Sequence, residues 1–258
     1  MATPLALRAA EAAALTYRST WRGSVFSTVV SPVLFLAAMG LGLGALVDDG
    51  GAVGVGAPDY LSFLAPGLLA AAAMQTGSFE SLWPVMAGIR WRRSYHAMLA
   101  TPLGAADIAH GHILWATVRV AMTAAAFLVV MVLFGAVESW WVVLALPAAV
   151  LTGAAHTAPL AGITASLEND YAVANIMRFG VIPLFLFSGT FFPIEQLPAW
   201  AEPVAFVTPL WHGVELCRTL SLGDASLLGS LGHAAYMAAF VIGGIRLTTW
   251  RFEKRLVL

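Results

Sequence analysis

Long apolar runs dominate this chain, and short stretches with charges, prolines or glycines separate them. The runs show no alternation of apolar and polar residues, which favours helices over barrel strands. A helix that crosses a bilayer needs about 20 mostly apolar residues. Six segments meet this requirement, and they predict membrane-spanning helices at 25–47, 61–82, 113–135, 142–166, 172–192 and 228–250.

The first 24 residues lack such a run and place their charges on one side of a helix. Arg8, Glu11, Arg18 and Arg22 fall within about 80° of arc at 100° per residue. Trp21 offers an aromatic anchor at a membrane surface. We therefore expect an amphipathic helix that lies along the membrane interface, with a disordered tail as the alternative.

The composition agrees with a protein that lies in lipid. Hydrophobic residues make up 60% of the 258 residues and charged residues 10%, whereas soluble domains carry about 25% charged residues. The mean hydropathy is +0.83. The sequence therefore predicts an all-α integral membrane protein with a single transmembrane domain over residues 1–258.

The charges predict how this protein lies in the membrane. One side holds both predicted termini and most of the bases, which are Arg8, Arg18, Arg22, Arg90, Arg92, Arg93, Arg178, Arg246, Arg251, Lys254 and Arg255. The loops of the other side hold Arg218 and the acids Asp48, Asp49, Asp59, Glu138, Glu195, Glu202, Glu215 and Asp224. Lys and Arg concentrate in cytoplasmic loops. We expect a multi-pass protein of the inner (plasma) membrane with both termini in the cytoplasm.

Arg119 does not fit this distribution, because it falls inside the third predicted span. Its long stem favours snorkelling of the charge to the cytoplasmic interface. The alternative is a charge that faces a polar cavity or a partner carboxylate.

The sequence offers little for catalysis. Lys254 is the only lysine, and it follows the last predicted span with no glycine-rich turn before it, so we expect no Walker-type ATP site. Cys217 is the only cysteine, which excludes a multi-cysteine metal site. His110 and His112 are close in sequence but lie on different faces of a helix. We expect no catalytic residue, cofactor or metal on this chain.

The loop between the second and third predicted spans opens with a basic and aromatic patch. These residues are Arg90, Trp91, Arg92 and Arg93. The preference of arginine for the cytoplasmic side would itself explain the arginines. The following "SYHAMLA" places Tyr95, Met98 and Leu99 at helical spacing, and Pro102 marks a boundary of that helix. An exposed apolar face would favour docking of a protein partner, with a helix lying on lipid as the alternative.

The segment 193–227 stays hydrophobic but is divided by prolines. Pro198 and Pro203 leave room for only a short helix between them. Thr208 before Pro209 is a typical helix start. This segment is therefore predicted to form short helices on the outer side, between the fifth and sixth spans.

Three stretches carry a resemblance to a known family. They are "YHAMLATPLGAADI", "ENDYAVANIMRFGVIPLFLFSGTFFPIEQLP" and "TPLWHGVELCR". With the six-span pattern, they resemble the permease subunits of type-2 ATP-binding-cassette (ABC-2) exporters. The branch with daunorubicin-resistance and nodulation-factor (lipooligosaccharide) export permeases looks closest, and the resemblance covers essentially the whole chain.

The resemblance implies a homodimer of permeases in membrane lipid, bound to two copies of an ABC ATPase subunit that hold ATP and Mg²⁺, with no nucleic acid partner. Residues 89–101 look like the coupling helix that docks on the ATPase, and residues 1–24 like the connecting helix beside it. Many relatives carry an acidic-basic run before the coupling helix. This chain has "GIRWRR" instead, whose arginines would reach for acidic groups on the ATPase.

The resemblance also makes residues 193–227 an outer re-entrant hairpin that caps an export path. The candidate residues of the path or its outer gate are Phe187, Phe191, Phe192, Trp211, His212 and Glu215. The aromatic residues would either pack in the core or contact cargo. The spacing of His212 and Glu215 allows a hydrogen bond, which would either hold the hairpin together or take part in gating.

The expected function is outward transport of an amphiphile, such as a drug, a glycolipid or a lipid-linked saccharide, with ATP hydrolysis on a separate subunit. The alternative is a membrane scaffold or assembly protein without a transport cycle.

Overall fold

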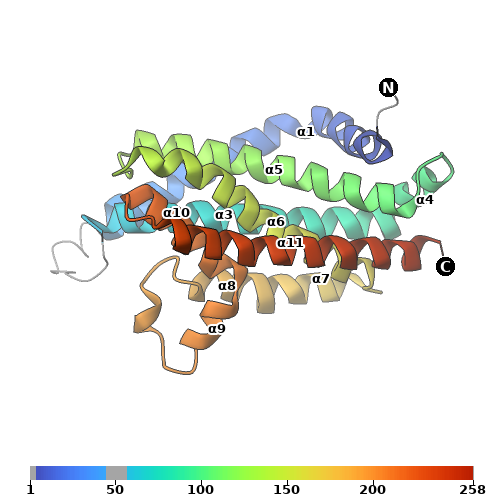
Figure 1. Cartoon of the computed structure of the whole chain (residues 1–258). Helices are drawn as coiled ribbons and strands as arrows, with labels where there is room; N and C mark the ends of the chain where they lie inside the picture. Colours follow the sequence, from blue (N-terminus) through green and yellow to red (C-terminus); the bar gives the residue numbers. More distant parts are fainter. Residues whose placement is uncertain (1–3, 45–56, 258) are drawn as a thin grey trace.

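The computed structural model describes residues 4–44 and 57–257, without the side chains of residues 24–27 and 41. All regular structure in these ranges is helical, and most helices run along one long axis (Figure 1). Within these ranges, four helical segments are long and apolar enough to cross a membrane, namely Ala105–Leu133, Trp140–Ala165, Asp170–Phe187 and Leu227–Leu256. A bent pair, Leu5–Gly23 with Thr28–Gly40, makes a fifth when it is taken as one span. The prediction of an all-α, multi-pass membrane protein is confirmed.

The N-terminal helix packs on the bundle. Helix α1 (Leu5–Phe35) continues into the π-helix η1 (Leu36–Leu43), with a bend of 50° between Leu5–Gly23 and Thr28–Gly40. Before the bend it lies against α5 (Ala105–Leu133), where a Cβ atom on Gly111 would come within 2.5 Å of Cβ of Ala9. The predicted end of the first span at 45–47 lies outside the described residues.

Helix α3 (Tyr60–Met86) occupies the centre of the bundle. Asp59 caps the start of this helix, because its carboxylate accepts a hydrogen bond from the Ser62 amide at 2.7 Å. Most of its length is buried by its neighbours, which include α5, α6 (Ala145–Ala165) and α10. The second predicted span is thus helical but is not among the apolar candidates, because polar residues such as Gln75 and Glu80 interrupt its apolar run.

A tight turn links α3 to α5. Helix α3 ends in the π-turn η2 (Ala87–Trp91), after which come the short helix α4 (Ser94–Leu99) and then α5. Helix α4 lies at the same end of the molecule as both termini (Figure 1). The three segments expected on one side of the membrane are therefore together in space.

The fifth predicted span consists of three consecutive pieces. These are α7 (Asp170–Ile176), the π-turn η4 (Met177–Val181) and α8 (Ile182–Phe187). The helix ends at Phe187 and not at residue 192, because Gly189 adopts a φ of +77° in the turn that follows. Helix α6 follows the 3-10 turn η3 (Trp140–Leu144).

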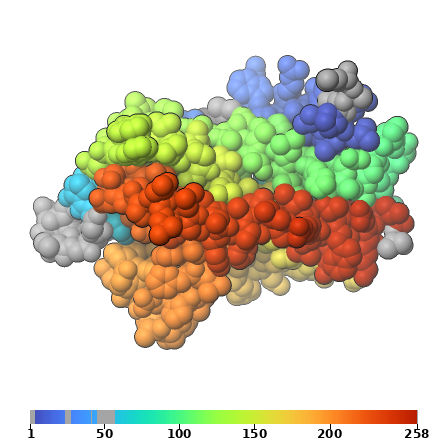
Figure 2. Space-filling view, viewed as in Figure 1, coloured from blue at the N-terminus to red at the C-terminus, as the bar shows by residue number. Residues whose placement is uncertain are grey.

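Residues 193–227, called the outer segment here after their predicted location, form short helices, as their prolines predicted. They are η5 (Ile194–Gln196), α9 (Glu202–Val207) and α10 (Pro209–Leu222). The Thr208 hydroxyl accepts a hydrogen bond from the Trp211 amide at 3.2 Å and so caps α10. The segment around α9 projects from the body, while α11 (Leu227–Leu256) runs uncovered along the face seen in Figure 2.

Candidate functional site

The predicted docking patch is exposed at the end of the bundle that carries both termini. The Trp91 side chain is 50% exposed, and Pro102 is exposed in the turn after α4. Arg93 adopts a left-handed conformation with a φ of 52°, which turns the chain sharply before α4. The outward-facing residues are Arg90, Trp91, Arg92 and Arg93.

The apolar side of α4 faces the bundle, so the prediction of an exposed apolar face is wrong. Tyr95 is only 8% exposed. Its hydroxyl lies 3.0 Å from Nδ1 of His112 on α5, and its ring centroid lies 5.5 Å from that of Phe252 on α11. Met98 and Leu99 are partly buried against the same cluster. Burial of these apolar side chains fastens α4 to the bundle, and a docking role of α4 now depends on its other face.

His212 and Glu215 each have a partner other than the one expected. Nδ1 of His212 lies 2.8 Å from Nδ1 of His233 on α11, so that one imidazole donates and the other accepts. The His212 ring also stacks on Tyr236 at 3.9 Å. Glu215 lies 3.9 Å from the guanidinium of Arg218. Burial, and to a smaller extent the neighbouring imidazole, lowers the pKa of His212. The contacts of His212 with His233 and Tyr236 hold α10 against α11, whereas the Glu215–Arg218 pair lies within α10.

Arg218 ties the outer segment to α3. Its Nη2 donates to the carbonyl of Gly189 at 2.7 Å, and its Nε donates to the carbonyl of Phe63 at 3.2 Å. The guanidinium carbon lies 3.8 Å from the centroid of the Phe63 ring. The adjacent Cys217 is buried, and this burial raises the pKa of its thiol to about 12. The only thiol of the chain is therefore unreactive in the folded protein.

The aromatic residues expected along a cargo path do not share one surface. Phe187 is exposed, whereas Phe191 packs edge-to-face on Phe185 with centroids 5.0 Å apart. Phe192 and Trp211 belong to a small cluster within the outer segment. Neither these residues nor the pair at 212 and 215 border the large cavity of the bundle.

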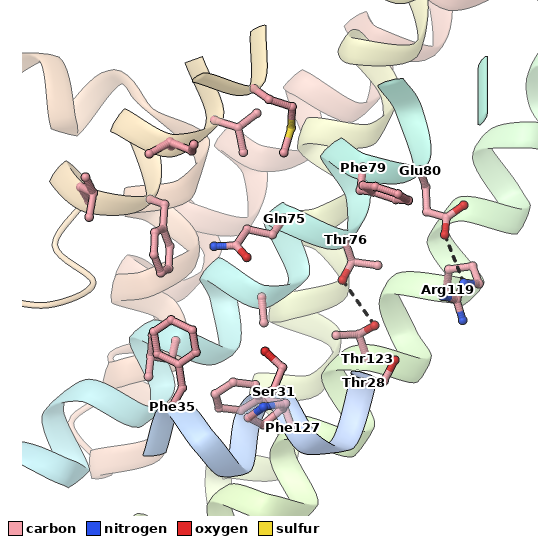
Figure 3. A pocket seen from close by; sticks show the side chains of 18 of the residues that line it. Thr28, Ser31, Phe35, Gln75, Thr76, Phe79, Glu80, Arg119, Thr123 and Phe127 are labelled. Atoms are coloured by element: carbon pink, nitrogen blue, oxygen red, sulfur yellow. Dashed lines mark hydrogen bonds and ion pairs between the residues drawn. The ribbon is translucent and has the colours of Figure 1, made fainter. Parts of the chain in front are cut away.

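That cavity has a volume of about 870 Å³ and lies between α1, α3, α5 and the α7–α8 unit (Figure 3). This size falls within the range of small-molecule sites. The space is partly open to the surroundings. Its apolar lining includes Phe35, Leu68, Phe79, Phe127, Val181, Ile182, Phe185 and Leu186.

An ion pair stands at one edge of the cavity (Figure 3). Nε of Arg119 donates to Oε1 of Glu80 at 3.2 Å, and the two side chains are 11% and 13% exposed. The Arg119 guanidinium also lies 4.3 Å from the ring centroid of Tyr17 in α1. Arg119 therefore faces a partner carboxylate in a cavity, and the interpretation as a snorkelling side chain is wrong.

Uncharged polar groups continue from this ion pair along the cavity wall. The Thr76 hydroxyl donates to that of Thr123 at 3.3 Å. Gln75 is exposed and points into the cavity from the middle of α3, and Ser31 faces it from α1 (Figure 3). Aromatic and polar side chains thus line one space, which suits a molecule with an apolar part and a hydrogen-bonding part.

Comparison with known proteins identifies the family. The sequence profile of the family described as ABC-2 type transporter matches residues 12–221, which is most of the chain. This chain belongs to the ABC-2 transporter family. It is therefore the membrane component of a transporter, and the cavity lies within an ABC-2 transmembrane domain.

Several curated relatives of this ABC-2 protein are called nodulation protein J. The one from Rhizobium meliloti (strain 1021) is 30% identical over 244 residues, which cover 94% of this chain and 90% of the relative. The one from Sinorhizobium fredii (strain NBRC 101917 / NGR234) is 32% identical over 236 residues, 91% of this chain and 87% of the relative. That from Bradyrhizobium diazoefficiens is 30% identical over 245 residues, with 94% and 90% covered.

Sequence reasoning missed several residues of this ABC-2 domain. Glu80 was detectable, because a carboxylate inside a predicted span needs a partner and Arg119 lay in the next span. Gln75 was detectable because a polar side chain inside a predicted span usually faces protein or a cavity. His233 had no comparable signal, because its role depends on the contact of α10 with α11.

Proposed function

We propose that this protein is the membrane subunit of an ATP-driven exporter that moves an amphiphile outward. The observation that carries the proposal is the cavity of about 870 Å³, where aromatic side chains and hydrogen-bonding groups line one space. The apolar wall would hold an acyl or ring system, and Gln75 with the threonine pair would bind hydroxyl or amide groups. A glycolipid or lipid-linked saccharide fits this division best, in line with the resemblance of the sequence to nodulation-factor (lipooligosaccharide) export permeases.

We also propose six spans in the plasma membrane with both termini in the cytoplasm. The grouping of α4 with both termini at an arginine-rich end supports this orientation. In this arrangement the first part of α1 lies near the cytoplasmic interface, and the segment from η5 to α10 caps the opposite end as a re-entrant hairpin.

The working assembly would contain two copies of this chain and two ABC ATPase subunits. Large apolar side chains of α1 and of the α7–α8 unit are exposed beside the cavity, among them Leu34 and Phe179. A second copy packed on this face would cover them and enclose the cavity. ATP and Mg²⁺ would bind on the ATPase, which would dock on the exposed patch formed by Arg90, Trp91, Arg92 and Arg93.

A reconstituted complex tests the proposal. The chain is co-expressed with an affinity-tagged candidate ABC ATPase from the same genome, and the complex is placed in proteoliposomes with a fluorescent lipooligosaccharide. We expect ATP-dependent transport that Gln75→Leu lowers about tenfold, the loss of roughly one hydrogen bond. The matched control, Gln196→Leu, changes an exposed glutamine of the outer segment and should transport normally. A stable complex without transport would instead support the scaffold alternative.

A further inference from the structure

The α7–α8 unit (Asp170–Phe187) forms one wall of the cavity, but its first residues do not border the cavity. Met177, Val181, Ile182, Phe185 and Leu186 of this unit border the cavity. Its first helical residue, Asp170, lies seven residues before Met177, which corresponds to about 10 Å along a helix. Movement at residue 170 therefore reaches the cavity wall through only two helical turns.

Asp170 makes a specific contact with the segment that leads into α4. The indole Nε1 of Trp91 donates to both carboxylate oxygens of Asp170, at 3.3 and 3.2 Å. Trp91 is the last residue of η2, and two residues separate it from Ser94, where α4 begins. The contact joins two parts of the chain that are 79 residues apart.

The surroundings keep this contact in place. The Trp91 ring lies 6.1 Å from that of Trp83 on α3, centroid to centroid. Val173 of α7 is also buried against Leu82 and Met86 of α3. The start of α7 is also locally defined, because the Asn169 side chain caps α7 by accepting a hydrogen bond from the Ala172 amide at 3.0 Å.

We propose that Trp91 and Asp170 form a strut that transmits movement of α4 to the cavity wall. The strut is the Trp91–Asp170 hydrogen bond together with the two residues that make it. An ATPase that pushes α4 would shift Trp91, because so few residues lie between them, and the hydrogen bond would shift the start of α7. Both residues are positioning residues that act through α7 and do not need to touch cargo.

Two further features favour transmission at this place. The connection to α4 turns sharply at Arg93, so α4 lies beside η2 and does not continue it as one long helix. The α7–α8 unit contains the π-turn η4, two of whose residues, Met177 and Val181, border the cavity. π-Turns are frequent at functional sites and accept local rearrangement. This inference rests on the proposed ATP-driven function.

Cysteine labelling tests the strut without a known cargo. Ser31→Cys places a thiol in the cavity, while the buried Cys217 stays unreactive. The complex is purified through a tag on the ATPase, so each measured sample contains it. The labelling rate of Cys at position 31 by a small charged thiosulfonate is measured with and without ATP, Mg²⁺ and vanadate.

We expect nucleotide to change the labelling rate in the parent background. Trp91→Phe, which keeps the ring on Trp83 but removes the N–H donor, should reduce that response about fivefold, as loss of one exposed charge-assisted hydrogen bond would. Asp170→Ala and the double variant should show the same reduction. Asp170→Asn keeps an acceptor oxygen and should restore most of the response, and the control Trp140→Phe, at an exposed indole of η3 that is not part of the strut, should leave it unchanged.

The outcomes separate the strut from the function that it serves. If the parent complex responds and Trp91→Phe responds equally, the strut is refuted. Independent effects of the two single variants, which multiply in the double variant, would refute it as well. If the parent complex shows no nucleotide response, the proposed ATP-driven function fails, and the strut fails with it.

Discussion

The ion pair between Glu80 and Arg119 is expected to contribute strongly to stability, and its contribution can be estimated. At the observed 3.2 Å, two unit charges attract by about 5 kcal/mol at an effective dielectric constant of 20. Arg119→Met removes this attraction and leaves Glu80 with little solvent. Breaking a buried ion pair by removing one partner costs about 3–5 kcal/mol, and the partial exposure of both side chains lowers this cost. We therefore expect the free energy of unfolding to fall by about 2–4 kcal/mol at pH 7.

A double-mutant cycle in mixed detergent and dodecyl sulfate micelles, followed by the loss of helical circular dichroism, measures the pair itself. The cycle uses Glu80→Gln, Arg119→Met and the double variant, with the exposed Arg90→Met as a control that should not change stability. We expect a coupling energy of about 2 kcal/mol. A coupling energy below about 0.5 kcal/mol would show that water in the cavity already separates the charges, and it would refute this reasoning.

Three further predictions follow from the packing. Gly213→Ala should lower the thermal midpoint of unfolding, because its Cβ would clash with the Thr152 side chain of α6. Gly232→Ala should not lower it, because the space beside Gly232 is open. The lowered pKa of His212 means that the folded protein binds this proton less readily than the unfolded chain. Stability should therefore be full above about pH 6.5 and fall as the pH drops below it, and His212→Phe should weaken this dependence in thermal melts. Tyr95→Phe should lower the thermal midpoint but leave ATPase co-purification intact. Arg92→Glu should leave the thermal midpoint unchanged but reduce ATPase co-purification. Loss of co-purification in Tyr95→Phe without a lower thermal midpoint would contradict the inward orientation of α4.

The periodicity and length of the apolar runs were sufficient to predict most of the helices. The Thr208 cap followed from local sequence rules, since a cap depends on neighbouring residues alone. The end of the fifth span was predicted too late. Hydrophobicity continues through residues 188–192, but the backbone turns at Gly189.

The cavity was the part that the sequence concealed. Its lining comes from four separate stretches, and no single stretch contains the pattern of the site. Tyr95 was interpreted as a docking residue because its neighbours form an apolar stripe, and a stripe has no direction until the helices beside it are placed. The partner of His212 could not be predicted either, because His233 lies on another helix. Glu80 differs, because a carboxylate in a predicted span was visible and was overlooked.

The most direct test of the account is whether the cavity carries the transported molecule. Ser31→Cys and the exposed Trp140→Cys, which lies away from the cavity on η3, are each labelled with a bulky maleimide in proteoliposomes that contain the complex. ATP-dependent transport of the lipooligosaccharide is then measured. Our account predicts that the label at position 31 abolishes transport and that the label at position 140 leaves it intact. Equal transport with both labels would contradict it.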